Sequence, residues 1–161
     1  MKRKLAGAAA TLLTVAGLAV AGCGSDDNKA STTTTPGGAG LTKAQYIAAA
    51  DKICKATSDK LVVAATKLRK SADKTGTIPI PKVTRFLTQT SLPAYEGMLA
   101  ELRALAAPKQ DEKTIDGIIA ALAGAIDTAK AQTEKVAKNQ VDPFDDANAR
   151  AVAYGMKVCG S

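Results

Sequence analysis

The side chains best suited to covalent chemistry in this sequence are the thiols of Cys23, Cys54 and Cys159. The chain contains no histidine. Histidine is the usual activator of serine and cysteine nucleophiles and the commonest metal ligand. No two cysteines have the Cys-x-x-Cys spacing of redox pairs, of zinc sites or of haem attachment sites. The sequence therefore predicts no catalytic residue, no metal and no cofactor.

Carboxylates are the other group that could do chemistry, and they gather at Asp142, Asp145 and Asp146. This spacing lacks the alternating oxygen ligands and the glycine of an EF-hand loop, so it favours helix capping over calcium binding. No second carboxylate is placed for glycosidase chemistry, and no glycine-rich phosphate loop occurs. An enzyme of unknown type is therefore only the third hypothesis.

The first 22 residues have the parts of a secretory signal peptide. Lys2, Arg3 and Lys4 precede an uncharged run that is rich in alanine and glycine and ends in small residues. A transmembrane helix needs about 20 strongly apolar residues, and this run is too weakly apolar to favour that alternative. The sequence predicts export.

The end of this segment, Val20-Ala21-Gly22-Cys23, resembles the lipobox of bacterial lipoproteins, in which an aliphatic residue and two small residues precede a cysteine. The resemblance implies cleavage between Gly22 and Cys23 and transfer of a diacylglycerol to the Cys23 thiol. Acyl chains contribute about 0.8 kcal/mol per buried CH₂, so two or three chains anchor a protein durably. The implied location is the extracytoplasmic face of a bacterial cell membrane, with the N-terminal lipid as the membrane contact.

Residues 23–40 form the next segment, which contains serine, threonine and glycine but no large apolar side chain. Such a segment buries too little surface to offset the entropy of ordering it, so it is predicted to be a disordered tether. Whether its threonines carry sugars stays open. The remaining residues, 41–161, are predicted to form one domain.

Four helical segments are predicted in that domain. Thr42 and Gln45 have the spacing of a capping box and open a helix that runs to about Lys70. A second run extends from Pro79 to Ala107, and Pro93 should kink it or split it near Ser91.

A third helix should begin near Asp111 and Glu112 and continue to Val136, and a fourth should begin at Asp142 and reach Val158. No segment shows the alternation of a strand. The predicted fold is all-α, an antiparallel up-down-up-down four-helix bundle.

With Cys23 assigned to lipid, Cys54 and Cys159 remain, and they allow a single intramolecular pairing. Export favours oxidation of this pair. In the predicted bundle the last helix ends near the half of the first helix that carries Cys54. We therefore expect a structural disulfide between the first and last helical segments.

Small residues form a stripe on the predicted third helix, and we call it the small-residue seam. Glycine inside a helix is less favourable than alanine by about 1 kcal/mol, so two glycines on one face invite an explanation. The seam is either packed on a neighbouring helix or open for docking of a partner chain. Its members are Gly117, Ala121, Gly124 and Thr128.

The formal net charge is +7 and falls to +4 when Lys2, Arg3 and Lys4 are removed with the signal peptide. The segment from Lys43 to Lys74 carries eight basic and three acidic residues. It is either a solvated helix face or a contact for an anionic envelope polymer. Nucleic acid is not predicted as a partner, because export and the lack of an aromatic-rich basic patch both oppose it.

The domain resembles small secreted lipoproteins of actinobacteria that combine a threonine-rich tether with a two-cysteine helical domain. The resemblance extends to the last segment, Tyr154-Gly155-Met156-Lys157-Val158-Cys159-Gly160. The leading hypothesis is a non-catalytic, lipid-anchored binding module of the cell envelope, with an envelope protein or polymer as its partner. The alternative is a carrier of a small apolar ligand or lipid. Its cavity would be lined by Phe86, Tyr95, Met98 and Leu102.

Overall fold

A computed structural model of the chain describes residues 40–161, and every regular element among them is helical. The predicted all-α class is confirmed for this part of the chain. The predicted signal peptide (1–22), Cys23 and the tether up to residue 39 lie outside the described residues. No helix from residue 40 onward is both long enough and apolar enough to cross a membrane.

The first helix, α1 (Lys43–Arg69), begins where the capping box predicts. The Thr42 hydroxyl accepts a hydrogen bond from the Gln45 backbone N–H at 3.3 Å, and the Gln45 side chain accepts one from the Thr42 N–H at 3.0 Å. Lys67 and Arg69 lie in the last turn, where positive charge suits the helix dipole. The buried residues of α1 all lie between Tyr46 and Thr57, so its C-terminal half has no fully covered face.

The second helical run is continuous but changes its winding before Pro93. It comprises α2 (Ile80–Phe86), a π-helical segment over Leu87–Ser91 and α3 (Leu92–Arg103). The Leu92 N–H reaches back five residues to the Leu87 carbonyl. Pro93 has no N–H to donate and its ring crowds the carbonyl four residues earlier, so a wider turn relieves the conflict. The predicted change near Ser91 is therefore present as a π turn.

The third helix, α4 (Glu112–Ala131), begins at the predicted acidic residues, after a short 3₁₀ turn at Lys109–Asp111. It does not continue unbroken to Val136 as expected. Gln132 leaves helical geometry with φ −120° and ψ 31°, and α5 (Thr133–Ala137) follows as a separate short helix.

The last helix, α6 (Asp145–Tyr154), is shorter than predicted at both ends. Asp142 is not its N-cap, because the Asp142 carboxylate accepts the Phe144 N–H at 3.0 Å and forms a local turn instead. The helix ends because Gly155 adopts a left-handed conformation, φ 113°, which a side chain would disfavour. The expected extension to Val158 is therefore wrong.

Residues 155–160 turn back toward α1, and we call them the C-terminal hook. The Asp51 carboxylate of α1 accepts the backbone N–H groups of Val158 and Cys159 at 3.0 and 3.2 Å. A Cβ at Gly160 would lie 2.7 Å from the Asn148 carbonyl oxygen, so only glycine fits there. The hook therefore explains both glycines of the C-terminal segment: one ends the helix and the other allows close approach.

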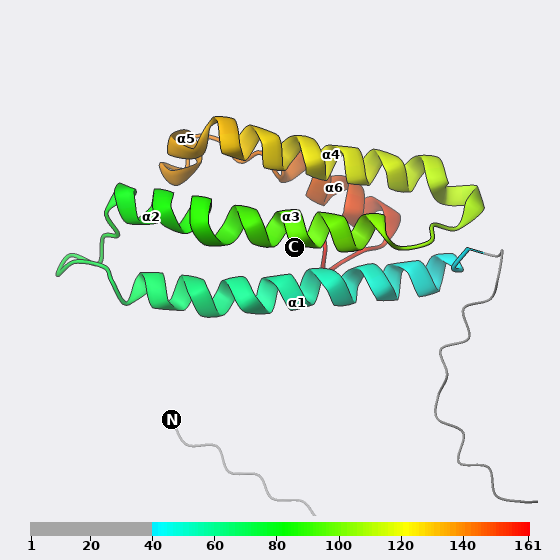
Figure 1. Ribbon diagram of the computed structural model, residues 1–161, viewed down its shortest axis with the longest axis horizontal. Coiled ribbons are helices and arrows are strands. Elements are labelled where there is room, and N and C mark those ends of the chain that lie inside the picture. Colours follow the sequence, from blue (N-terminus) through cyan, green and yellow to red (C-terminus); the bar gives the residue numbers. More distant parts are fainter. Residues whose placement is uncertain (1–39) are drawn as a thin grey trace, which may run out of the picture. The chain divides into compact units, whose positions relative to one another are not determined.

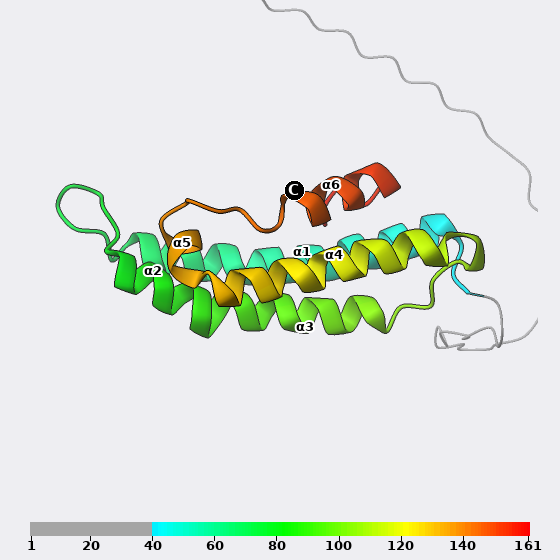
Figure 2. The same ribbon diagram turned by 90° about the horizontal axis from the view of Figure 1, so that it is seen from above.

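The helices lie lengthwise against one another, with α3 in contact with both α1 and α4, and α6 in contact with α4 (Figure 1). Seen from above, α6 covers only part of the length of the longer helices (Figure 2). Tyr46 and Ile126 are the most deeply buried large side chains of the core.

Tyr154 of α6 contacts residues at the N-terminal ends of both α4 and α1. Its hydroxyl donates to the Asp111 carboxylate at 2.8 Å, and the Lys43 ammonium lies 4.3 Å from its ring centre. Burial of the phenol, followed by the hydrogen bond to Asp111, raises the pKa of Tyr154 well above its usual range. The phenol therefore stays protonated and remains a donor at physiological pH.

Candidate functional site

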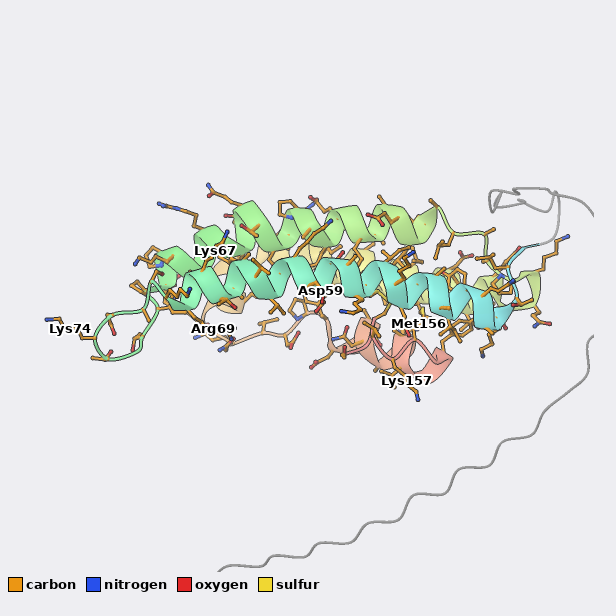
Figure 3. All side chains as sticks on the ribbon, turned by 90° about the horizontal axis from the view of Figure 1, so that it is seen from below. Asp59, Lys67, Arg69, Lys74, Met156 and Lys157 are labelled. Carbon is orange, nitrogen blue, oxygen red and sulfur yellow. A yellow bond between two sulfur atoms is a disulfide. The ribbon has the colours of Figure 1, made fainter. Side chains whose placement is uncertain are left out.

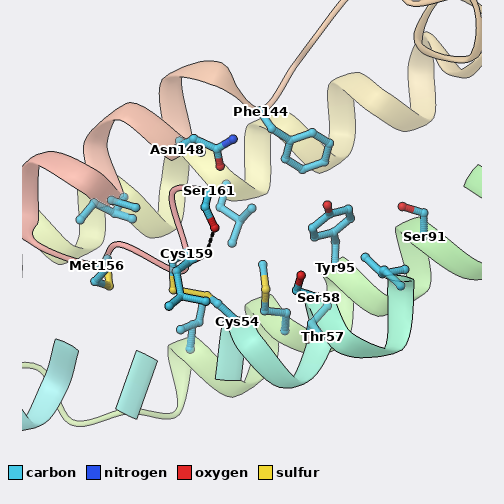
Figure 4. A pocket seen from close by; sticks show the side chains of 18 of the residues that line it. Cys54, Thr57, Ser58, Ser91, Tyr95, Phe144, Asn148, Met156, Cys159 and Ser161 are labelled. Carbon is cyan, nitrogen blue, oxygen red and sulfur yellow. Dashed lines mark hydrogen bonds between the residues drawn. A yellow bond between two sulfur atoms is a disulfide. The ribbon is translucent and has the colours of Figure 1, made fainter. Parts of the chain in front are cut away.

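A cavity of about 440 Å³ lies between α1, the π turn and α3 on one side and α4, α6 and the hook on the other (Figure 4). This volume falls within the range of about 300 to 1,000 Å³ found for small-molecule sites. Its walls are mostly aliphatic and aromatic, and they come from segments far apart in the sequence. The site is therefore built by the tertiary fold rather than by a local motif.

All four residues that the sequence assigns to a carrier cavity line this one. They are Phe86, Tyr95, Met98 and Leu102. Helical spacing places Tyr95, Met98 and Leu102 on one face of α3. Phe86 lies nine residues before Tyr95, with the π turn between them, so only the α3 part of this wall follows from spacing.

The sequence does not predict the rest of the wall. This part includes the C-terminal half of α1 and the segment from Asp142 through the hook, and its members include Leu61, Val62, Ala65, Phe144, Asn148 and Val158. The sequence indicates only Leu61, which lies seven residues after Cys54 and therefore shares its helix face. The rest depends on how far α6 extends, which the helix prediction overestimates.

The cavity exists because α6 is too short to cover α1. The helix α1 has 27 residues and α6 has 10. Beyond Thr57 no α1 residue is buried, although Leu61, Val62 and Ala65 continue its apolar face. The uncovered apolar surface there forms the cavity wall.

Two aromatic side chains of the lining contact each other. The rings of Tyr95 and Phe144 lie with centroids 4.8 Å apart at an interplanar angle of 31°, and Figure 4 shows them facing each other. Burial, with a smaller contribution from the Asp142 carboxylate, raises the pKa of Tyr95. Tyr95 therefore presents a neutral hydroxyl beside an apolar space.

A few polar groups interrupt the apolar lining. Thr57 and Ser91 are both buried, and Ser58, Asn148 and Ser161 also line the space. The Ser161 hydroxyl donates a hydrogen bond to the Val158 carbonyl at 2.9 Å, drawn as a dashed line in Figure 4. A small number of hydroxyl and amide groups on apolar walls is typical of sites that orient a ligand.

The disulfide lines the cavity. The sulfur atoms of Cys54 and Cys159 are 2.08 Å apart and form the bond expected from the cysteine count. The hook residue Met156 is buried beside them. The same covalent bond that secures the chain terminus thus forms part of the cavity wall.

The small-residue seam is not one continuous open surface. A Cβ at Gly117 would lie 3.9 Å from the Arg150 guanidinium of α6, and Ala121 packs against the core. Gly124 is exposed, and a Cβ added there would have no atom within 4 Å, whereas Thr128 is half-buried. The seam therefore divides into a part that faces α6 and a part that faces solvent.

The acidic cluster does not act as a unit in the structure. Asp142 holds the turn before α6, and Asp146 pairs with Arg150 at 2.8 Å. Between residues 40 and 161, no set of three potential metal ligands is grouped closely enough to hold an ion. The cavity is the feature with the geometry of a binding site.

Comparison of the chain with protein-family models, with curated proteins and with solved structures found no match.

Proposed function

We propose that this chain is a non-catalytic, lipid-anchored binding protein that holds a small apolar ligand in the cavity of its helical domain. The cavity is the observation that carries the proposal. It combines a volume of about 440 Å³ with apolar walls and a few hydroxyl groups. A ligand that fills it gains about 25 cal/mol for each Å² of apolar surface removed from water.

The proposal includes an architecture, an antiparallel four-helix bundle whose fourth member is short. The packing of α3 on α1 and α4, and of α6 on α4, supports this arrangement. The disulfide supports it too, because it returns the chain end to α1. In this view the ligand occupies the space that a full-length fourth helix would fill.

The anchor and the location come from the sequence. Cys23 in its lipobox-like setting would carry the lipid, on the extracytoplasmic face of a bacterial cell membrane. A protein held there meets apolar molecules that leave or enter the bilayer. The anchor and the cavity are therefore compatible with a single role in carrying such molecules.

Docking of a partner chain on the seam has weaker support than ligand binding. Gly124 lies on an open part of the seam, but Gly117 and Ala121 face α6 and the core. An exposed glycine alone offers little area for a partner to bury. The cavity provides a concave, mostly apolar surface, so ligand binding is the function that we propose.

Two adjacent valines of α1 give a matched test. Val62 and Val63 are 57% and 58% exposed, yet only Val62 lines the cavity. A carboxylate at Val62 would have to lose water when an apolar ligand binds beside it. We expect Val62→Asp to weaken binding of the neutral probe N-phenylnaphthylamine about tenfold, measured by fluorescence titration of the full chain.

Val63→Asp is the control, because it adds the same charge to the same helix turn outside the cavity. It should bind the probe as the unmodified chain does, and thermal melting should show similar stability for the two variants. Equal probe affinity in both variants, or no saturable binding to the unmodified chain, would contradict the proposed function.

A further inference from the structure

The cavity is elongated along α1. Its lining on this helix begins at Tyr46, includes Cys54, Leu61 and Ala65, and reaches Arg69. At 1.5 Å per helical residue, Cys54 and Arg69 are about 22 Å apart along the helix axis. A mostly apolar space lined over this length suits an extended hydrocarbon chain better than a compact ring system.

The two ends of the cavity differ in chemistry. Toward Cys54, the lining is mostly apolar and includes the disulfide, Met156 and Ala151, with the Tyr46 ring beyond Cys54. At the other end, Arg69 is exposed and forms no ion pair with any residue from 40 to 161. Its Nη2 donates to the Thr66 hydroxyl at 3.3 Å, and its other N–H groups are free to bind an anion.

The surroundings of Arg69 are strongly basic. Residues 67–85 contain six basic side chains and one acidic side chain, Asp73. Figure 3 shows Lys67, Arg69 and Lys74 at the same end of α1. The Asp73 carboxylate accepts hydrogen bonds from the backbone N–H groups of Thr75 and Thr77, at 2.8 and 3.0 Å. This end of the domain therefore attracts anions.

Asp142 is the one acidic side chain in the lining of the cavity. It lies close enough to Tyr95 to raise the pKa of that phenol. One of its oxygens already accepts the Phe144 N–H. The negative charge of Asp142 therefore lies beside Tyr95 and Phe144 in the middle of the cavity. The basic side chains of residues 67–85 lie at the end that Arg69 lines.

We propose that the ligand is a single-chain amphiphile with an anionic head group, which lies against Arg69 while the hydrocarbon chain extends along α1 toward the disulfide. This inference rests on the proposed function and adds the class and the orientation of the ligand. The hydrocarbon chain supplies most of the affinity by burial, and the guanidinium selects the head group.

Three probes of equal chain length test the head group: dodecanoate, dodecanol and dodecyltrimethylammonium. Each displaces N-phenylnaphthylamine from the full chain, at concentrations below those at which micelles form. We expect dodecanoate to bind about three- to fivefold more tightly than dodecanol, the size of effect measured for exposed ion pairs. The cationic probe should bind most weakly.

Arg69→Gln should remove the preference for dodecanoate over dodecanol. Lys60→Gln is the control, because it removes one positive charge from α1 outside both the cavity lining and the basic cluster, and it should keep the preference. If dodecanol and dodecanoate bind equally to the unmodified chain, or if Arg69→Gln keeps the preference, the head-group assignment is wrong and the proposed function stands. If no probe displaces the fluorophore, the proposed function fails as well.

Discussion

Replacing both Cys54 and Cys159 with alanine is expected to lower the free energy of unfolding by as much as about 4.7 kcal/mol. The bridge spans a sequence separation of 105 residues, so it greatly restricts the unfolded chain. It also holds the hook, together with the two hydrogen bonds to Asp51 and the burial of Met156. Urea unfolding followed by far-ultraviolet circular dichroism measures the loss.

The reducing agent provides the control. It should lower the urea midpoint of the unmodified chain toward that of the Cys54→Ala, Cys159→Ala double variant and leave the double variant itself unchanged. A double variant as stable as the oxidised unmodified chain would show that the bridge does not hold the fold. Loss of the bridge should also weaken probe binding, because the bridge forms part of the cavity wall.

Replacing Tyr46 with alanine is expected to cost about 3 to 5 kcal/mol, the range found when large aromatic side chains are deleted from cores. The Tyr46 side chain is 1% exposed. Its ring meets that of Tyr154 edge-on with centroids 6.2 Å apart, so it links α1 to α6. Thermal and urea unfolding of the variant measure the loss.

Tyr46→Phe separates the ring from the hydroxyl. Phenylalanine keeps the ring and its packing, so we expect this variant to lose less than about 1.5 kcal/mol. If Tyr46→Phe were as destabilised as Tyr46→Ala, the hydroxyl rather than the aromatic packing would be the main contribution of this residue.

The parts of the fold that the sequence predicts are those set by local chemistry. The capping box at Thr42 and Gln45 depends on residues three apart, and the structure begins α1 there. The pairing of Cys54 with Cys159 follows once Cys23 is set aside, since two cysteines leave one choice. Pro93 indicates a disturbed helix because the missing N–H acts within one turn.

The predicted start of α6 is wrong because one sequence pattern is compatible with two local structures. Asp142 before Pro143 suits a helix N-cap, yet the same carboxylate can close a turn with the Phe144 N–H. Long-range contacts decide between the two. The end of α6 is set by Gly155, a common signal for a helix end that the prediction of a longer helix passed over.

The candidate site is half predictable for the same reason. Tyr95, Met98 and Leu102 share a face of α3, so their spacing places them together. The rest of the wall needs Phe86, Val62 of α1, Phe144 and the hook, which meet only in the folded chain. The cavity follows from the difference in length between α1 and α6, which no local pattern encodes.

The most direct test of the central claim is native mass spectrometry of the protein purified gently from its host. The account predicts a non-covalent apolar ligand on the wild-type protein, with reduced occupancy in Val62→Asp and unchanged occupancy in Val63→Asp. Protein that carries no such ligand, or equal occupancy in the two variants, would contradict the account.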